Sequence, residues 1–362
     1  MNQTLNTNPP IPMEDGGATT DRKRKAEEGV KPAEEDEDGV KQIDVVEGSK
    51  HSDGSIYRAD AHPLHELFHL ADTRETRLKP MRLTNPTPSC YPCWTACRQH
   101  LGCAMLQIFS LKLAKLPSTA PPGGHGPVHL YGFVAVRDLL DPLRNYVFNR
   151  SRDDPLVIPD PTSDPFIYLS GPKRGVYLQS RVLIEYDVRI KAREGEELED
   201  DLPLIDGAAT VSELAWTQAA LTSRIPGELG AAVDLRRSLL RHAVEATVEV
   251  RITRLVAGPG PGTRPRAVEL EITGCLAGGE LVEEEIKLFR GVVREPCALE
   301  RFVVAARSDS YLFLHFKGAG AAKPPEEFDW FAFRVTSHGC ASDRRKFGLA
   351  TVEVKVTWSS LC

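Results

Sequence analysis

Apolar and polar residues alternate along much of the chain after residue 103. The segment 181–191 reads RVLIEYDVRIK, and the segment 243–255 reads AVEATVEVRITRL. A period of two is the signature of a half-buried β-strand. The residues expected on the buried faces are Val182, Ile184, Tyr186, Val188 and Ile190 in the first segment, and Val244, Ala246, Val248, Val250 and Ile252 in the second.

Similar apolar runs predict further strands, and turns rich in glycine and proline separate them. The runs lie at 104–115, 128–137, 145–149, 166–170, 176–179, 202–205, 210–216, 266–273, 286–289, 302–306, 311–317, 328–336 and 350–358. No amphipathic helix of ordinary length lies between them, so the crossovers of a parallel α/β fold are missing. We therefore expect residues 100–362 to form an all-β, antiparallel β-sandwich of roughly a dozen strands.

The segments before residue 100 have a different composition. Residues 1–55 carry few large apolar side chains and an acidic block at 34–38. Ordering a residue costs roughly 1–2 kcal/mol of backbone entropy, so we expect a disordered acidic leader here.

Residues 56–99 form a linker with a short helix, because Leu64, Leu67 and Phe68 have helical spacing. His65 and His69 lie four residues apart there, and docking of the helix on the domain is favoured over a metal pair.

Net charge and hydropathy limit the partners and the cellular compartment that we expect. A net charge of −6 and a pI near 6.0 give no basic surface for phosphates, so a nucleic-acid partner is not expected. No apolar run reaches about 18 residues, so no membrane span is expected. The N-terminus lacks a secretory signal, which indicates the cytoplasm or nucleus. The basic cluster Arg22, Lys23, Arg24 and Lys25 is a candidate import signal, or else a solvated charge run.

Cysteines gather just before the first strand. The candidate metal ligands are Cys90, Cys93, Cys97, His100 and Cys103. Zinc accepts four such ligands in a tetrahedron, and a CxxC pair can also be a redox site. The ligands form no second spaced pair, and no βαβ unit follows. Buried or spare thiols are therefore the favoured interpretation, and no cofactor is expected.

Acidic residues after the second predicted strand form another candidate site. Asp138, Asp141, Asp153 and Asp154 can meet at one end of a sandwich and offer oxygens to calcium. Four arginines are interleaved with them, namely Arg137, Arg144, Arg150 and Arg152. Arg–carboxylate pairs satisfy both sets without a metal, and we favour this structural network.

No local string in the sequence is assigned to catalysis. It contains no GxSxG, so a nucleophile elbow is not present, and its HExxH string, HELFH at 65–69, holds the His65–His69 pair for which helix docking is favoured over metal binding. The glycine-rich run 258–262 reads GPGPG. Its prolines lack N–H groups and no helix follows, so it cannot hold phosphate as a P-loop does. We assign no catalytic residue.

Several segments together resemble a known family. They are MLQIFSLKLAK at 105–115, LYGFVAVRD at 130–138, DPLRNYVFNRSRDDP at 141–155, LSGPKRG at 169–175, VLIEYD at 182–187 and VKVTWSS at 354–360. From about residue 100 to 360 the chain is similar to the plant family of domains of unknown function numbered 6598, which is expanded in grasses. The resemblance implies a β-rich domain with no established activity. Some members are linked to ribosome-inactivating proteins, the rRNA N-glycosidases of stress responses.

The glycosidase link can be tested on the residues. That family carries a Glu-Ala-x-Arg type helix, and the nearest string here is LERFVVAAR at 299–307. Glu300 and Arg307 have the wrong order and spacing, and the two valines between them favour a strand. No catalytic residue is carried over.

These observations favour a non-enzymatic β-sandwich interaction module with an unknown ligand and a protein partner, acting in plant stress or defence. One alternative is a protein associated with, or resembling, an rRNA N-glycosidase, which is also the enzyme class left open. The other is a calcium-dependent lipid-binding module that uses the aspartates at 138–154.

Overall fold

The structure is a computed structural model, and it confirms an antiparallel, mostly β chain. It describes residues 40–58, 64–90, 99–118, 126–192, 201–215, 220–255, 267–278, 281–319, 329–347 and 350–361. No helix in these ranges is long and apolar enough to cross a membrane.

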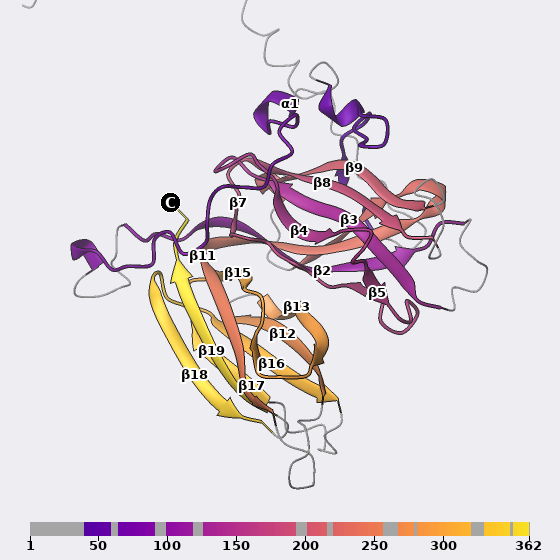
Figure 1. Cartoon of the computed structure of the whole chain (residues 1–362). Helices are drawn as coiled ribbons and strands as arrows, with labels where there is room; N and C mark the ends of the chain where they lie inside the picture. The colour runs from indigo at the N-terminus through magenta and orange to yellow at the C-terminus, as the bar shows by residue number, and fades with distance from the viewer. Residues whose placement is uncertain are drawn as a thin grey trace, which may run out of the picture. The chain divides into compact units, whose positions relative to one another are not determined.

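Three sheets contain all the described strands (Figure 1). The first has the order β1 (Asp44–Val45), β9 (Leu202–Ser212), β8 (Arg181–Ile190), β3 (Val128–Arg137) and β4 (Asn145–Arg150), with β5 (Leu156–Ile158) also on β3. The second has the order β18 (Gly339–Lys346), β19 (Ala350–Ser359), β11 (Ala232–Leu255), β2 (Cys103–Lys115) and β6 (Phe166–Ile167). The third has the order β13 (Leu281–Val293), β12 (Val268–Gly278), β16 (Tyr311–Ala319) and β17 (Asp329–Arg334).

Four shorter strands extend the second sheet. Strand β7 (Val176–Tyr177) pairs with β2, and β10 (Leu221–Pro226), β14 (Cys297–Ala298) and β15 (Phe302–Arg307) pair with β11. Strand β11 is the axis of this arrangement, with 24 residues. Its first part pairs with β2 and β10, and its second part pairs with β19 and β15 (Figure 1). The register with β2 shifts between Leu240 and Ala243, where His242 adopts a φ of 53°.

Because the two parts of β11 pair with different strands, the sheets enclose two hydrophobic cores, and β11 contributes to both. One core lies between the first sheet and β2 with the first part of β11, and it includes Val134, Ile184 and Leu235. The other lies between the second part of β11, with β19, and the third sheet; it includes Val248, Phe331 and Trp358. The alternation at 182–190 and 244–252 places its apolar residues in these two cores, with Ile190 only partly buried.

The opposite face of the first sheet is also covered, which the alternation does not indicate. Leu183 lies fully buried on that face beneath Val46, Ile56 and Phe68. Strand β1 pairs with β9 and is part of this cover. Residues 40–55 therefore pack on the sheet, which corrects the leader boundary expected at 55. Apolar residues are sparse in this stretch, yet Ile43, Val46 and β-pairing anchor it. The basic cluster 22–25 and the acidic block 34–38 lie outside the described residues.

The segment between 56 and 99 contains the expected short helix. Helix α1 (Leu64–Leu67) makes one turn and buries Leu64, while Phe68 just after it is fully buried. The His65 ring Nε2 lies 2.9 Å from the Tyr57 carbonyl oxygen, a hydrogen bond that fixes the helix on the domain. Two short 3-10 turns, η1 (Ser55–Tyr57) and η2 (Pro88–Cys90), flank this region.

Candidate functional site

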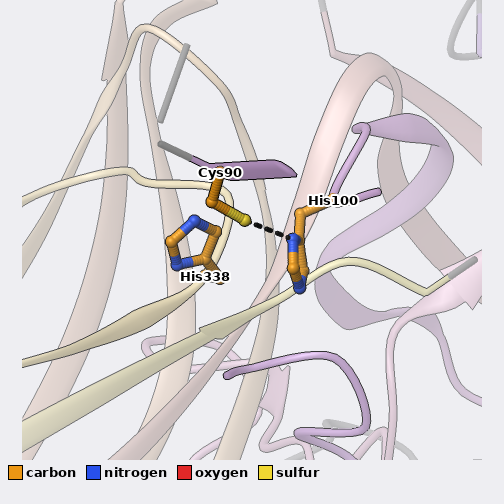
Figure 2. A group of neighbouring side chains, drawn as sticks. All are labelled: Cys90, His100 and His338. Atoms are coloured by element: carbon orange, nitrogen blue, oxygen red, sulfur yellow. Dashed lines mark hydrogen bonds between the residues drawn. The ribbon is translucent and has the colours of Figure 1, made fainter. Parts of the chain in front are cut away.

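Two of the predicted metal ligands meet a histidine from the far end of the sequence (Figure 2). Cys90 ends η2, His100 precedes β2, and His338 lies in the turn between β17 and β18. The three potential ligand atoms lie within 4.8 Å of one another. The Cys90 Sγ is 3.3 Å from His100 Nδ1, and the two imidazole centroids are 4.6 Å apart. In Figure 2 the sulfur lies between the two rings.

Backbone pairing brings these segments together. Leu83 forms an antiparallel bridge with Ser360, and the Gly339 N–H donates to the Thr84 carbonyl at 2.8 Å. Gly339 has a φ of 87°, which lets the chain turn directly into β18. The segment preceding η2 therefore runs beside the turn that carries His338.

Burial and hydrogen bonds define the electrostatics of the cluster. Cys90 and His100 are buried, and the Thr87 N–H donates to the Cys90 sulfur at 3.2 Å. Burial, and then electrostatic interaction with the neighbouring His100, lower the pKa of His338, which favours its neutral imidazole. The His338 Nε2 is buried and has no hydrogen-bond partner among the described residues. A neutral imidazole with an unpaired nitrogen beside a thiol suits a metal ion.

The other predicted ligands lie elsewhere. Cys103 opens β2, pairs with Ala243 and packs beside the second core. Cys93 and Cys97 lie outside the described residues. Sequence reasoning missed His338, because its distance from Cys90 along the chain gives no local motif; only the fold brings it to the cluster.

The predicted aspartates split into two groups. Asp138 lies just after β3 and forms a two-pronged ion pair with Arg174, at 2.6 and 2.9 Å, with both side chains buried. Asp141 accepts hydrogen bonds from the Thr76 hydroxyl at 2.7 Å and from the Arg77 N–H at 3.1 Å. These carboxylates hold the segment 76–77 and Arg174 in place.

Asp153 and Asp154 lie at the other end of the β3–β4 pair. The register Gly132↔Arg150 and Val136↔Asn145 separates them from Asp138 by the length of the strands. Asp154 pairs with Arg150 at 2.8 Å on the surface. The structure therefore does not bring the four aspartates together, and Arg–carboxylate pairs account for Asp138 and Asp154.

A second group of buried charges surrounds Glu185 on β8. Its carboxylate accepts hydrogen bonds from Arg137 Nε at 2.7 Å and from Arg144, and it also contacts the His51 ring at 2.9 Å. The same ring contacts Asp206 at 2.8 Å. Burial opposes the charged carboxylate, but hydrogen bonds from His51 and Arg144 and the two guanidinium charges lower the pKa of Glu185 to about 2. This cluster fastens the 40–58 segment to the first sheet.

A pocket of about 630 Å³ lies between the first sheet and β15. Its walls come from the segment Glu75–Met81, from β4, from the loop 170–173 and from the start of β15. Lys79, Lys173 and Arg301 bring three cations to it, and Glu75 is the one carboxylate in its lining. Glu75 is held by Lys173 at 2.8 Å.

Comparisons with solved structures give only distant likenesses. Human GIVD cytosolic phospholipase A2 has 8% identity and a TM-score of 0.21, over 70% of this chain and 33% of that chain. The chain thus spans about a third of the length of that phospholipase. The calcium-bound tandem C2 domains of Extended-Synaptotagmin 2 have 10% identity and a TM-score of 0.25, over 72% of this chain and 99% of that one. Scores this low support no argument about fold or function.

The family comparison is more informative. A search of curated proteins finds no match. The model of a family described as a domain of unknown function matches residues 105–357, which span β2 to β19 and both cores. The chain belongs to this family, DUF6598.

Proposed function

We propose that the chain is a non-enzymatic β-sandwich interaction module that binds an anionic group in the pocket beside β4 and β15. The supporting observation is the pocket itself. Its volume of about 630 Å³ falls within the range of small-ligand sites, roughly 300–1,000 Å³. The three cations outnumber the two carboxylates that pair with them, Glu75 with Lys173 and Glu249 with Arg301, and this excess of positive charge favours a carboxylate or phosphate over a cationic ligand.

The pocket loop is held in place independently of any ligand. The N–H groups of Ser170 and Gly171 donate to the Val147 carbonyl at 2.9 and 3.2 Å, and the Ser170 hydroxyl accepts from the Asn149 N–H at 3.0 Å. A Cβ at Gly171 would lie 1.9 Å from the Tyr146 carbonyl oxygen. Only glycine allows this approach, so the loop is pre-organised against β4.

The anionic group can belong to a small molecule or to an acidic segment of a protein partner, and one experiment separates these sources. Thermal melting of the full chain is measured with dicarboxylates, with sugar phosphates and with an acidic peptide. We expect one class to raise the Tm, and Lys79→Glu to abolish that rise. Lys346→Glu, an exposed cation on β18 outside the pocket lining, is the matched control. The proposal fails if no probe raises the Tm, or if Lys79→Glu responds like the wild type.

The calcium-dependent alternative receives less support from the geometry. Asp138 and Asp154 pair with arginines, and the four aspartates lie at two ends of the β3–β4 pair. Isothermal calorimetry with calcium on the wild type and on Asp153→Asn/Asp154→Asn tests it. Binding that the double variant removes would favour this alternative over the anion pocket.

The glycosidase alternative also lacks a site in this geometry. Arg307 ends β15, whereas Glu300 lies two residues before that strand begins, and the strand alone spans roughly 17 Å. They cannot contact one sugar ring together. A depurination assay on ribosomes, with Glu300→Ala as the variant, tests the link to ribosome-inactivating proteins and with it the predicted role in plant stress.

A further inference from the structure

We propose that Cys90, His100 and His338 bind a zinc ion, which links the segment before β2 to the turn that begins β18. The proposal is independent of the anion pocket, because none of the three residues lines that pocket.

The distances fit a site that is nearly formed. Zinc binds sulfur at about 2.3 Å and imidazole nitrogen at about 2.0 Å, so two such ligands in a tetrahedron lie about 3.5 Å apart. The Cys90 Sγ–His100 Nδ1 distance is 3.3 Å, and all three potential ligand atoms lie within 4.8 Å of one another. Contraction by about 1 Å around a central ion completes the first three positions of the tetrahedron.

The hydrogen bonding indicates that a metal ion belongs between the three residues. A thiol hydrogen-bonded to one imidazole accounts for Cys90 and His100. It does not account for His338, whose Nε2 is buried without a hydrogen-bond partner among the described residues. Buried polar atoms in native proteins are nearly always satisfied. A metal ion beside this nitrogen satisfies it.

The ligand types limit the choice of metal. Calcium and magnesium prefer oxygen ligands, whereas zinc and copper both accept thiolate and imidazole ligands. The Thr87 N–H, which donates to the Cys90 sulfur at 3.2 Å, stabilises the thiolate form that a metal requires. Since Cys90 and His100 come from the segment before β2 and His338 from the turn before β18, the ion connects these two segments as a disulfide would.

The test uses the full chain, loaded with zinc and dialysed, with bound metal measured by atomic emission and by the absorption of a cobalt(II)-substituted sample. We expect one zinc per chain, a tetrahedral cobalt spectrum with a thiolate charge-transfer band, and loss of both in Cys90→Ser and in His338→Asn. Cys340→Ser is the matched control, because Cys340 is an exposed thiol two residues after His338. A chelator should lower the Tm of the wild type and of Cys340→Ser, but not that of His338→Asn.

X-ray absorption at the zinc edge of the wild-type protein keeps the test decisive if a variant fails to fold. A shell with both sulfur and imidazole nitrogen is expected. A shell of sulfur alone would overturn the assignment, because it would place the ion on the cysteines without His338. Zinc retained by a folded His338→Asn variant, or a wild type that binds neither zinc nor cobalt, would also overturn it.

Discussion

Replacing Glu185 by glutamine removes the negative charge from a buried ion cluster while keeping the shape of the side chain. The Glu185 and Arg137 side chains are both 0% exposed, and that of Arg144 is 8% exposed. After the change, two guanidinium groups remain buried with no full counter-charge. Removing one partner of a buried pair costs about 3–5 kcal/mol.

The lowered pKa of Glu185 corresponds to a free energy of similar size. The carboxyl falls from an ordinary value of 4.5 to about 2, and each pKa unit corresponds to about 1.4 kcal/mol, so the ionised form contributes about 3 kcal/mol. Because the folded pKa is the lower one, this contribution is fully present above pH 4.5 and is lost as the pH falls from there toward 2.

Urea unfolding at neutral pH, followed by circular dichroism, measures the effect as a shift in midpoint at constant slope. We expect Glu185→Gln to lose about 3–5 kcal/mol. Asp154→Asn is the matched control, because the exposed Arg150–Asp154 pair should contribute at most about 1 kcal/mol. Equal stability of the two variants would refute the reasoning that burial makes the Glu185 pair strong.

Three further changes test other parts of the structure. Burial opposes the charged His51 ring, but hydrogen bonds and charges of Asp206 and Glu185 outweigh it and raise the pKa of His51 above its ordinary value of 6.5. Its contribution is therefore present below pH 6.5 and is lost as the pH rises through the raised value, so the hydrogen-exchange protection factors of 43–57, which are corrected for the intrinsic rise of exchange with pH, should fall at high pH, and His51→Asn should remove this fall. Phe331→Ala empties a fully buried position and should cost about 3–5 kcal/mol in urea unfolding, whereas Trp330→Ala, 41% exposed, should cost under about 1 kcal/mol. Gly171→Ala should displace the pocket loop from β4 and abolish any anion-induced rise in Tm; an unchanged rise would show that the loop does not shape the pocket.

The sequence allowed the central strands to be predicted, because their side chains face one core at a period of two. Strand β3 was predicted at 128–137, its observed bounds. Strand β18 was missed, because it is an edge strand whose side chains are mostly exposed, and GCASDRRK contains no apolar alternation. Only the second part of β11 was predicted, because the first part is interrupted by bulges that break the period.

The functional residues were harder to predict, for a physical reason. Glu185 occupies a position that the alternation assigns to solvent, but the segments 40–58 and 64–70 cover that face of the sheet and Glu185 is buried there. His338 joins Cys90 and His100 through pairings between distant segments, which no local spacing encodes. The cysteine cluster in the sequence indicated the right region, because two of its predicted ligands, Cys90 and His100, lie together in the structure.

Strand β11 has a consequence for any attempt to divide the protein. A β-sandwich that ends at a linker can be expressed alone, but here residues 232–255 pair through backbone hydrogen bonds with strands around both cores. A truncation on either side of residue 243 would leave half of the strand without its neighbours and open an unpaired edge to aggregation. The two cores should therefore unfold together. A chain cut between them should yield insoluble fragments rather than two folded halves.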